Sequence, residues 1–172
     1  TEKELRDVIF GWEGLAKGFA KGGVVLDLGT SDPVATVALA KELAERGIYL
    51  VDAPAVGSRD LAKLGKLRFL AGGEDEAFQK CRPVLEALGE SVIHVGPAGS
   101  GQAMTALGDY LRAAGLLAAT EALEIGRRFG LKAEAILDAG EAMGGIGAAA
   151  KESLRANVLT RKWESGVALG QV

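Results

Sequence analysis

The chain has 172 residues, of which 48% are hydrophobic and 25% charged, and its net charge is −3. These proportions predict a folded protein with a sizeable core and exclude a disordered chain. The scattered Lys and Arg residues provide no basic footprint for nucleic acid, and the longest apolar runs fall well short of the roughly 20 residues that a membrane span needs.

The single cysteine, Cys81, excludes an internal disulfide framework and agrees with reducing surroundings. No signal-peptide pattern opens the sequence, so we expect a cytoplasmic protein. No cluster of Cys, His, Asp and Glu has the spacing of metal ligands, so we expect no metal site. The expected partner is a small-molecule substrate, with no nucleic acid and no membrane.

In the first half of the sequence, short β-branched runs alternate with amphipathic segments. We expect strands at 24–28, 48–51, 67–71 and 91–95, and helices at 33–46 and 74–88. Such alternation predicts an α/β fold with a mostly parallel sheet flanked by helices.

The second half is predicted to be helical. A long helix at 102–129 ends at Gly130, a favourable C-cap residue, and shorter helices follow at 133–143 and 148–159 with glycines between them. We place the domain boundary near the loop 96–101, which divides the chain into domains at 1–98 and 99–172.

The glycines of this loop follow a strand and precede a helix, as in a phosphate-binding turn. However, Met104 occupies the third glycine position of that fingerprint, and Glu121 lies within a predicted helix rather than after a second strand. The loop is therefore interpreted as a domain junction whose helix N-terminus faces an active-site cleft.

Four segments occur in a fixed order: VVLDLGTSDP (24–33), VDAPAVGS (51–58), LRFLAGGEDEAFQKCRPVLEALG (67–89) and VGPAGSGQAMTALGDY (95–110). Together they resemble the β-hydroxyacid dehydrogenases, the group that contains 3-hydroxyisobutyrate and 6-phosphogluconate dehydrogenases and, more distantly, imine reductases. The resemblance implies the later part of a Rossmann-type parallel sheet, then a long interdomain helix and an all-helical domain.

The resemblance also implies an activity and an assembly. Members transfer hydride between NAD or NADP and a small hydroxy acid or its aldehyde or ketone, and we expect a homo-oligomer, a dimer built through the helical domains. The family's GxGxxG turn precedes the region matched by Thr1 onward, and a further lysine motif follows Val172. We therefore expect a fragment that is inactive alone, in which the choice of NAD or NADP cannot be read.

The family's catalytic lysine corresponds to Thr105, and the asparagine three residues later corresponds to Gly108. Neither replacement can do the family's chemistry, because a threonine hydroxyl has no useful pKa near neutrality and glycine has no side chain. Asp109 is a candidate replacement acid if burial raises its pKa. The alternative is a local ion pair between Asp109 and Arg112, which share one helical face.

The resemblance assigns two further groups. In VDAPAVGS, Val56, Gly57 and Ser58 stand where the family has a serine and two glycines that hold a substrate carboxylate, so the backbone amides remain while the serine hydroxyl is displaced. In VVLDLGTSDP, Thr30 keeps the hydroxyl expected near the nicotinamide ribose. Its alternative role is that of a turn or N-cap residue before Pro33.

Two other functions remain open. One is an imine reductase-like enzyme with Asp109 or Tyr110 as the proton donor. The other is a catalytically inactive homologue that binds a nucleotide or a partner, suggested by the departures at Val56, Thr105 and Gly108. The only histidine, His94, is expected to be a packed or edge residue, and Cys81 is expected in the core with Phe78, Leu85 and Leu88.

Overall fold

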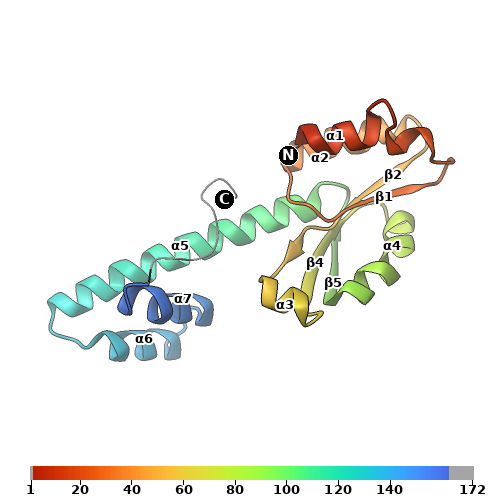
Figure 1. Cartoon of the computed structure of the whole chain (residues 1–172). Coiled ribbons are helices and arrows are strands. Elements are labelled where there is room, and N and C mark those ends of the chain that lie inside the picture. The colour runs from red at the N-terminus through yellow and green to blue at the C-terminus, as the bar shows by residue number, and fades with distance from the viewer. Residues whose placement is uncertain (1, 163–172) are drawn as a thin grey trace. The chain divides into compact units, whose positions relative to one another are not determined.

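The computed structural model describes residues 2–162, whose contacts divide into two compact units, Thr1–Leu107 (unit 1) and Gly108–Val172 (unit 2). Unit 1 begins with helix α1 (Glu2–Phe10) and a 3₁₀ turn (Leu15–Lys17) (Figure 1). Its remaining elements are β1 (Val24–Asp27), α2 (Pro33–Ala44), β2 (Tyr49–Asp52), β3 (Ala55–Val56), α3 (Arg59–Lys63), β4 (Leu67–Gly72), α4 (Asp75–Leu88) and β5 (Gly89–Gly96). Helix α5 (Ser100–Arg128) begins in unit 1 and continues into unit 2.

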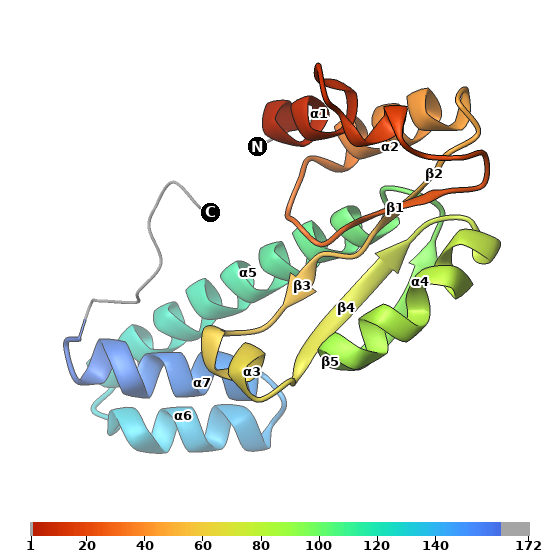
Figure 2. The ribbon, with the colours of Figure 1, turned by 45° about the vertical axis from the view of Figure 1, so that its right-hand side comes forward.

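The five strands form one sheet in which β1 and β2 are parallel, as are β4 and β5. Strand β4 runs antiparallel to β2 and to β3. The pairs Asp52↔Gly72 and Ala55↔Phe69 show that β3 continues β2 along β4, as Figure 2 shows. The expected parallel pairs are thus present, and the antiparallel join between them was not anticipated.

Every predicted strand and helix of unit 1 is present, with ends displaced by one or two residues. Four short elements were not predicted from the sequence: α1, the 3₁₀ turn at Leu15–Lys17, the two-residue β3 and the five-residue α3. Elements of two and five residues are too short to establish a hydrophobic period. Helix α3 instead depends on a cap, because the Ser58 hydroxyl accepts a hydrogen bond from the Leu61 N–H at 3.2 Å.

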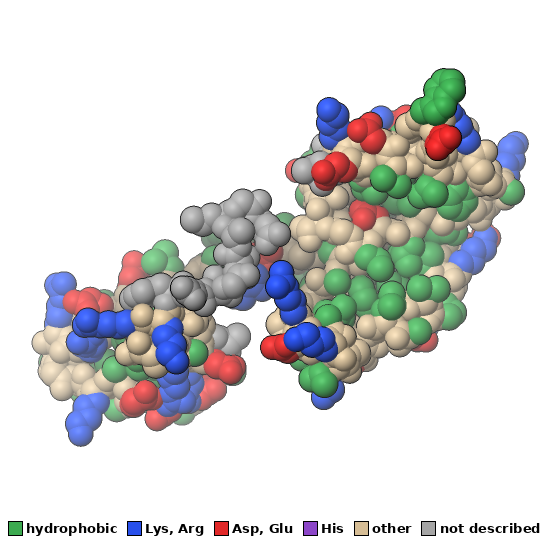
Figure 3. All heavy atoms as spheres, in the orientation of Figure 1, with side chains coloured by type: hydrophobic (Ala, Val, Ile, Leu, Met, Phe, Trp, Pro, Cys, Tyr) green, Lys and Arg blue, Asp and Glu red, His purple; other side chains and the backbone are tan. Residues whose placement is uncertain are grey.

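Two apolar clusters cover the two faces of the sheet. Alternate strand residues point to opposite faces, so Leu50 packs with Leu43 of α2 and Ile9 of α1, while Val51 packs with Phe78 of α4. Figure 1 shows α1 and α2 on one side of the strands and α4 on the other. In the space-filling view, hydrophobic side chains of unit 1 lie together over the strands (Figure 3).

The contacts divide within α5, after Leu107. The first turns of α5 belong to unit 1 because they pack directly on the sheet. A Cβ at Gly101 would collide with the carbonyl oxygens of Leu70 and Asp52, so only glycine allows this approach.

Unit 2 contains the rest of α5, then α6 (Ala133–Ala142), α7 (Ala148–Ser153) and a π-helical turn (Leu154–Leu159). The predicted helix at 148–159 is therefore divided at Ser153. The core of this unit is formed by Ala119, Leu123, Leu137, Ile146 and Leu154. Arg155 bridges Glu134 and Asp138 of α6 at 2.7 Å each, which ties the π turn to that helix.

Replacement of Gly101 by alanine should lower the free energy of unfolding by about 1–3 kcal/mol, because the added methyl group must displace backbone oxygens. Gly115→Ala on the same helix is the control. Nothing lies within 4 Å of its added Cβ, so it should raise stability by about 0.5–1 kcal/mol. Urea unfolding followed by circular dichroism measures both changes, and equal effects would contradict the close approach at Gly101.

Candidate functional site

The last residues of four strands lie in one row across the sheet. Asp27 of β1 pairs with Asp52 of β2, Asp52 pairs with Gly72 of β4, and Gly72 pairs with Gly96 of β5. The row therefore places two buried carboxylates beside two glycines. A Cβ at Gly72 would come within 2.7 Å of the Asp52 carboxylate and of the Pro97 carbonyl oxygen, so the missing side chain makes room for the N-terminus of α5.

Asp52 is fully buried, and both of its carboxylate oxygens bind the start of α5. Oδ1 accepts a hydrogen bond from the Gly99 N–H at 2.6 Å, and Oδ2 accepts one from the Gln102 N–H at 2.9 Å. Burial raises the pKa of Asp52, and these N–H donors partly offset that rise. The carboxylate satisfies donors that have no partner within the helix and lies at the positive end of the helix dipole.

Asp27 is only partly satisfied. Its Oδ1 accepts a hydrogen bond from the Gly29 N–H at 2.9 Å, whereas its buried Oδ2 has no partner among the described residues. Burial raises the pKa of Asp27, and the Gly29 N–H opposes the rise. Asp27 is thus the carboxyl group of the row that has an unused acceptor position.

The Gln102 side chain joins α5 to the loop that follows β1. Its Nε2 donates to the Gly29 carbonyl oxygen at 2.8 Å, and its Oε1 accepts from the Ser31 N–H at 3.0 Å. These two bonds hold the backbone on either side of Thr30. The Thr30 side chain is exposed and makes no hydrogen bond in the described part of the chain. The structure therefore presents this hydroxyl outward from a loop that is fixed at two points.

Thr105 follows Gln102 by three residues on α5, so the two lie on the same side of the helix. Thr105 is half-buried, and its side-chain oxygen Oγ1 is buried without a hydrogen-bond partner among the described residues. Gly108, one turn further on, is exposed, and nothing lies within 4 Å of the position that a Cβ would take. A larger side chain therefore fits at residue 108.

Asp109 is exposed and forms an ion pair with Arg112, with 2.6 Å between Oδ1 and Nη2. This is the i,i+3 pair that the spacing predicted as the alternative to a replacement acid. Tyr110 is 70% exposed. Neither candidate donor is enclosed by the described residues, as a group that must hold a proton for delivery would need to be.

The segment Val56–Ser58 lies directly before α3. Val56 is half-buried in β3, while Gly57 and Ser58 are exposed. The Ser58 hydroxyl caps α3, and within residues 2–162 no hydrogen bond joins it to α5. The structure thus brings the Thr30 loop and the first turn of α5 together, but it does not link the Val56–Ser58 loop to them by hydrogen bonds.

The other residues that the sequence singled out are structural. His94 stacks on Phe78 with 4.3 Å between ring centroids, and its Nε2 lies 2.8 Å from the Gly73 carbonyl oxygen. Cys81 is a buried free thiol whose pKa is raised by burial, and it packs with Phe78 and Leu85 as predicted. Leu88, at the end of α4, is 42% exposed.

Among the described residues, no group of three or more His, Cys, Asp or Glu side chains is arranged to hold a metal ion. No helix in this part of the chain combines the length and apolar character required to cross a bilayer.

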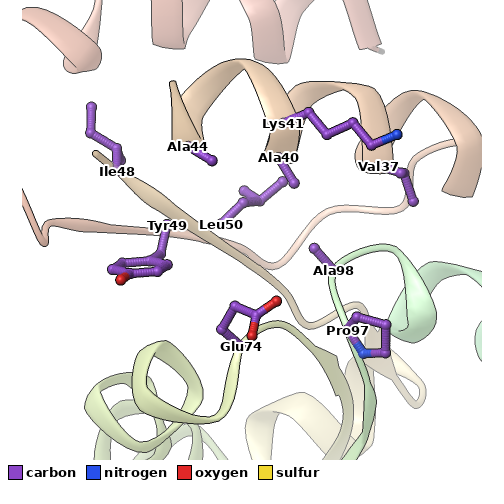
Figure 4. Close-up of a pocket in the computed structure, with 10 residues that line it drawn as sticks. All are labelled: Val37, Ala40, Lys41, Ala44, Ile48, Tyr49, Leu50, Glu74, Pro97 and Ala98. Carbon is purple, nitrogen blue, oxygen red and sulfur yellow. The ribbon is translucent and has the colours of Figure 1, made fainter. Parts of the chain in front are cut away.

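A cavity of about 280 Å³ opens between α2 and β2 (Figure 4). Its walls are apolar apart from Lys41, Tyr49 and Glu74, and the loop residues Pro97 and Ala98 close one end. None of the predicted site residues lines it. Its volume is close to the lower end of the roughly 300–1,000 Å³ of typical ligand pockets.

Three residues that shape the site, Asp27, Asp52 and Gln102, were not selected as candidates from the sequence. Asp27 is the second-last residue of the predicted strand 24–28 and Asp52 directly follows the predicted strand 48–51, and a charged residue near the carboxyl end of a strand is a signal that was available. No comparable signal exists for Gln102, because its partners Gly29 and Ser31 are 73 and 71 residues away.

The buried carboxyl group of Asp27 leads to a prediction about pH. Asp27→Asn removes a carboxyl group whose pKa is raised in the folded state. Because the folded wild type binds this proton more readily than the unfolded chain, wild type gains stability relative to the variant as the pH falls from 7 through the raised pKa. The stability of the variant minus that of wild type should therefore be greatest near neutrality and shrink on acidification. Urea unfolding of both proteins between pH 7 and pH 4 measures this difference. A difference that stays constant or grows as the pH falls would contradict the assignment.

The comparisons with known proteins agree with this architecture. Residues 1–96 match the family model of the NAD binding domain of 6-phosphogluconate dehydrogenase. Mitochondrial 3-hydroxyisobutyrate dehydrogenase from Bos taurus is 35% identical over 121 residues, which are 70% of this chain and 36% of that protein. The chain spans less than half of the length of such curated relatives.

Solved structures show the same fold. A 3-hydroxyisobutyrate dehydrogenase from Mycobacterium tuberculosis, solved with L-serine, has a TM-score of 0.78 at 24% identity, covering 85% of this chain and 49% of that one. An imine reductase from Myxococcus stipitatus, solved with NAD⁺, has a TM-score of 0.70 at 21% identity, covering 92% and 53%. The family model thus matches more than half of the residues of this chain. The chain therefore belongs to the β-hydroxyacid dehydrogenase family, and its matched part belongs to the NAD-binding domain.

Proposed function

We propose that this chain forms part of an NAD(P)-dependent dehydrogenase that acts on a small hydroxy acid or on its aldehyde or ketone. The observation that carries the proposal is the Gln102 side chain, which holds the backbone on both sides of Thr30 against the first turn of α5. Thr30 is the position expected at the nicotinamide ribose, and Thr105, in the second turn of α5, is the position of the family's proton-transferring lysine. The proposal therefore rests on one side chain that joins the loop of the first of these positions to the helix that carries the second.

The residues present fit the nicotinamide end of the cofactor. The exposed Thr30 hydroxyl can donate a hydrogen bond to a ribose oxygen or accept one from a ribose hydroxyl, and its loop is already ordered by Gln102. The unpartnered Oδ2 of Asp27 adds a buried acceptor two residues before Gly29. When bound, the nicotinamide ring supplies the site that accepts or releases hydride.

The segment Val56–Ser58, which corresponds to the family's substrate-binding segment, has fewer polar side chains available than the family has. Gly57 and Ser58 are exposed, so their backbone N–H groups are available to a carboxylate, but Val56 contributes no hydroxyl. The Ser58 hydroxyl is engaged at the start of α3. We therefore propose a substrate whose carboxylate, where it has one, is held by backbone amides.

Of the roles that the family's site performs, proton transfer is the one for which this chain's side chains are least suited. The Thr105 hydroxyl can hydrogen-bond a substrate oxygen, and its buried, unpartnered Oγ1 supports such a contact. A hydroxyl of this kind does not release its proton near neutral pH, so Thr105 binds and orients rather than acting as a general acid or base. Turnover of hydroxy acids is accordingly expected to be slow.

Two alternatives follow from the same departures. An imine reductase-like enzyme would need Asp109 or Tyr110 to deliver the proton, and the exposure of both side chains argues against that role. A catalytically inactive homologue would retain the cofactor-facing loop without turnover, as the replacements at Val56, Thr105 and Gly108 suggest. The two experiments below separate these alternatives from the main proposal.

We also propose that the whole protein is a homodimer built through its helical unit and that it acts in the cytoplasm. Large apolar side chains are exposed along α5 in unit 2, including Leu111, Leu117 and Ile125, and such surfaces favour association. The one cysteine is a free thiol, which agrees with a reducing compartment.

Restoring the lysine and the asparagine should restore proton transfer. In the whole protein, Thr105→Lys combined with Gly108→Asn should raise hydroxy-acid oxidation by about 10²-fold, the usual scale of general acid–base catalysis. The open space at Gly108 accommodates the new side chain. The measurement is steady-state kcat/KM with 3-hydroxyisobutyrate and L-serine, with Gly108→Asn alone as the control. No gain would mean that the substrate pocket has also diverged, and that result would favour the inactive homologue.

The second experiment tests the replacement acid. Because Asp109 is exposed and paired with Arg112, Asp109→Asn should leave the rate of cyclic-imine reduction and the cofactor affinity unchanged within about twofold. Arg112→Gln breaks the same ion pair from the other side and serves as the control. A loss of imine reduction in Asp109→Asn but not in Arg112→Gln would make Asp109 the proton donor.

A further inference from the structure

Gln102 is 2% exposed, which is unusual for a long polar side chain. Its carboxamide uses its acceptor for the Ser31 N–H and one donor for the Gly29 carbonyl oxygen. An apolar side chain of the same length would fill the space but leave both backbone groups unpaired. The loop 29–31 would then lose its two connections to α5, although the helix itself would still be capped by Asp52.

Asp52 fixes the residue that carries this side chain. Its Oδ2 accepts the N–H of Gln102, and its Oδ1 accepts the N–H of Gly99 three residues earlier. The carboxylate therefore anchors the first turn of α5 at two points. The glycines at 72 and 101 lack the Cβ atoms that would interfere with this arrangement.

These contacts form one continuous chain of hydrogen bonds. It runs from the end of β2 at Asp52, through the backbone and side chain of Gln102, to the loop that presents Thr30. The loop has a second support from Asp27, whose Oδ1 holds the Gly29 N–H. Thr30 itself makes no bond within the described residues, so its position depends on Gln102 and Asp27.

We propose that Gln102 is a positioning residue for the nicotinamide end of the cofactor, and that Asp52 acts on the cofactor through Gln102 by setting the register of the first turn of α5. The inference rests on the proposed function, because it takes the ligand beside Thr30 to be a nicotinamide dinucleotide. It goes further in assigning a selective role to these residues, which order the nicotinamide half of the ligand and leave the adenosine half unaffected.

The experiment compares two ligands on the whole protein. The first is NADH or NADPH, whichever binds more tightly, and the second is ADP-ribose or its 2′-phosphate, which lacks the nicotinamide. Gln102→Met removes both side-chain hydrogen bonds while retaining the length of the side chain. Calorimetric titration should give a dissociation constant about fivefold weaker for the dinucleotide, the scale of such neutral bonds, and within about twofold of wild type for the ADP-ribose ligand.

The control is Asp32→Ala, which removes a different carboxylate from a helix N-terminus. Asp32 caps α2 through the Ala35 N–H at 2.8 Å and takes no part in the Gln102 bonds. This variant should lose stability, as a missing N-cap does, and keep the ratio of the two affinities. Equal weakening of both ligands by Gln102→Met, or no weakening of either, would reduce Gln102 to a structural residue and overturn the proposal.

Asp52→Asn tests the second half of the inference. If Asp52 acts through Gln102, then Asp52→Asn should also weaken the dinucleotide selectively, and the double variant should be no weaker than the worse single variant. Multiplicative effects would overturn the role of Asp52. A wild-type protein that binds neither ligand would refute the proposed function and this inference together, whereas wild-type binding without a selective effect would refute the inference alone.

Discussion

The contact between the Asp52 carboxylate and the first turn of α5 is the constraint on which the rest of the site depends. A helix that begins on top of a sheet buries N–H groups that have no partner within the helix, and each buried unpaired donor costs about 1–3 kcal/mol. Asp52 removes two of these costs at once. The cost of burying its charge is in turn reduced by the donors it accepts and by the helix dipole. With the helix start fixed in this way, the Gln102 side chain reaches the loop after β1.

Much of unit 1 could be predicted because its longer elements are specified locally. Alternating β-branched runs and amphipathic segments predicted β1, β2, β4, β5, α2 and α4 to within one or two residues. The antiparallel join could not be predicted, because β3 contains two residues and its pairing partners on β4 are chosen by tertiary contacts. The division of contacts after Leu107 has a similar cause. It depends on the packing of Gly101 against Leu70, which is 31 residues earlier in the sequence.

The site shows the same limit at the level of side chains. Positions such as Thr105 and Gly108 could be found because the surrounding segment resembles a family motif, and the Asp109–Arg112 pair follows from helical spacing alone. The bonds that order the site join residues 47 to 73 positions apart. Only the polar residues at the ends of β1 and β2 pointed toward them. His94 was expected to be a packed or edge residue, and its stacking on Phe78 became known only from the structure.

The residues that hold this site and the residues that would perform its chemistry face different physical constraints. Asp52 and Gln102 are almost completely buried, and each polar atom of their side chains has a hydrogen-bond partner, so a single replacement leaves backbone groups unpaired and lowers stability. Thr105 is half-buried and Gly108 is exposed, so replacement at either position has little structural cost. Side chains at these two positions can therefore be exchanged while the hydrogen-bonded framework around them persists. For this reason an intact fold does not by itself imply turnover in this chain, and a replacement at residue 105 does not imply a rearranged loop at Thr30.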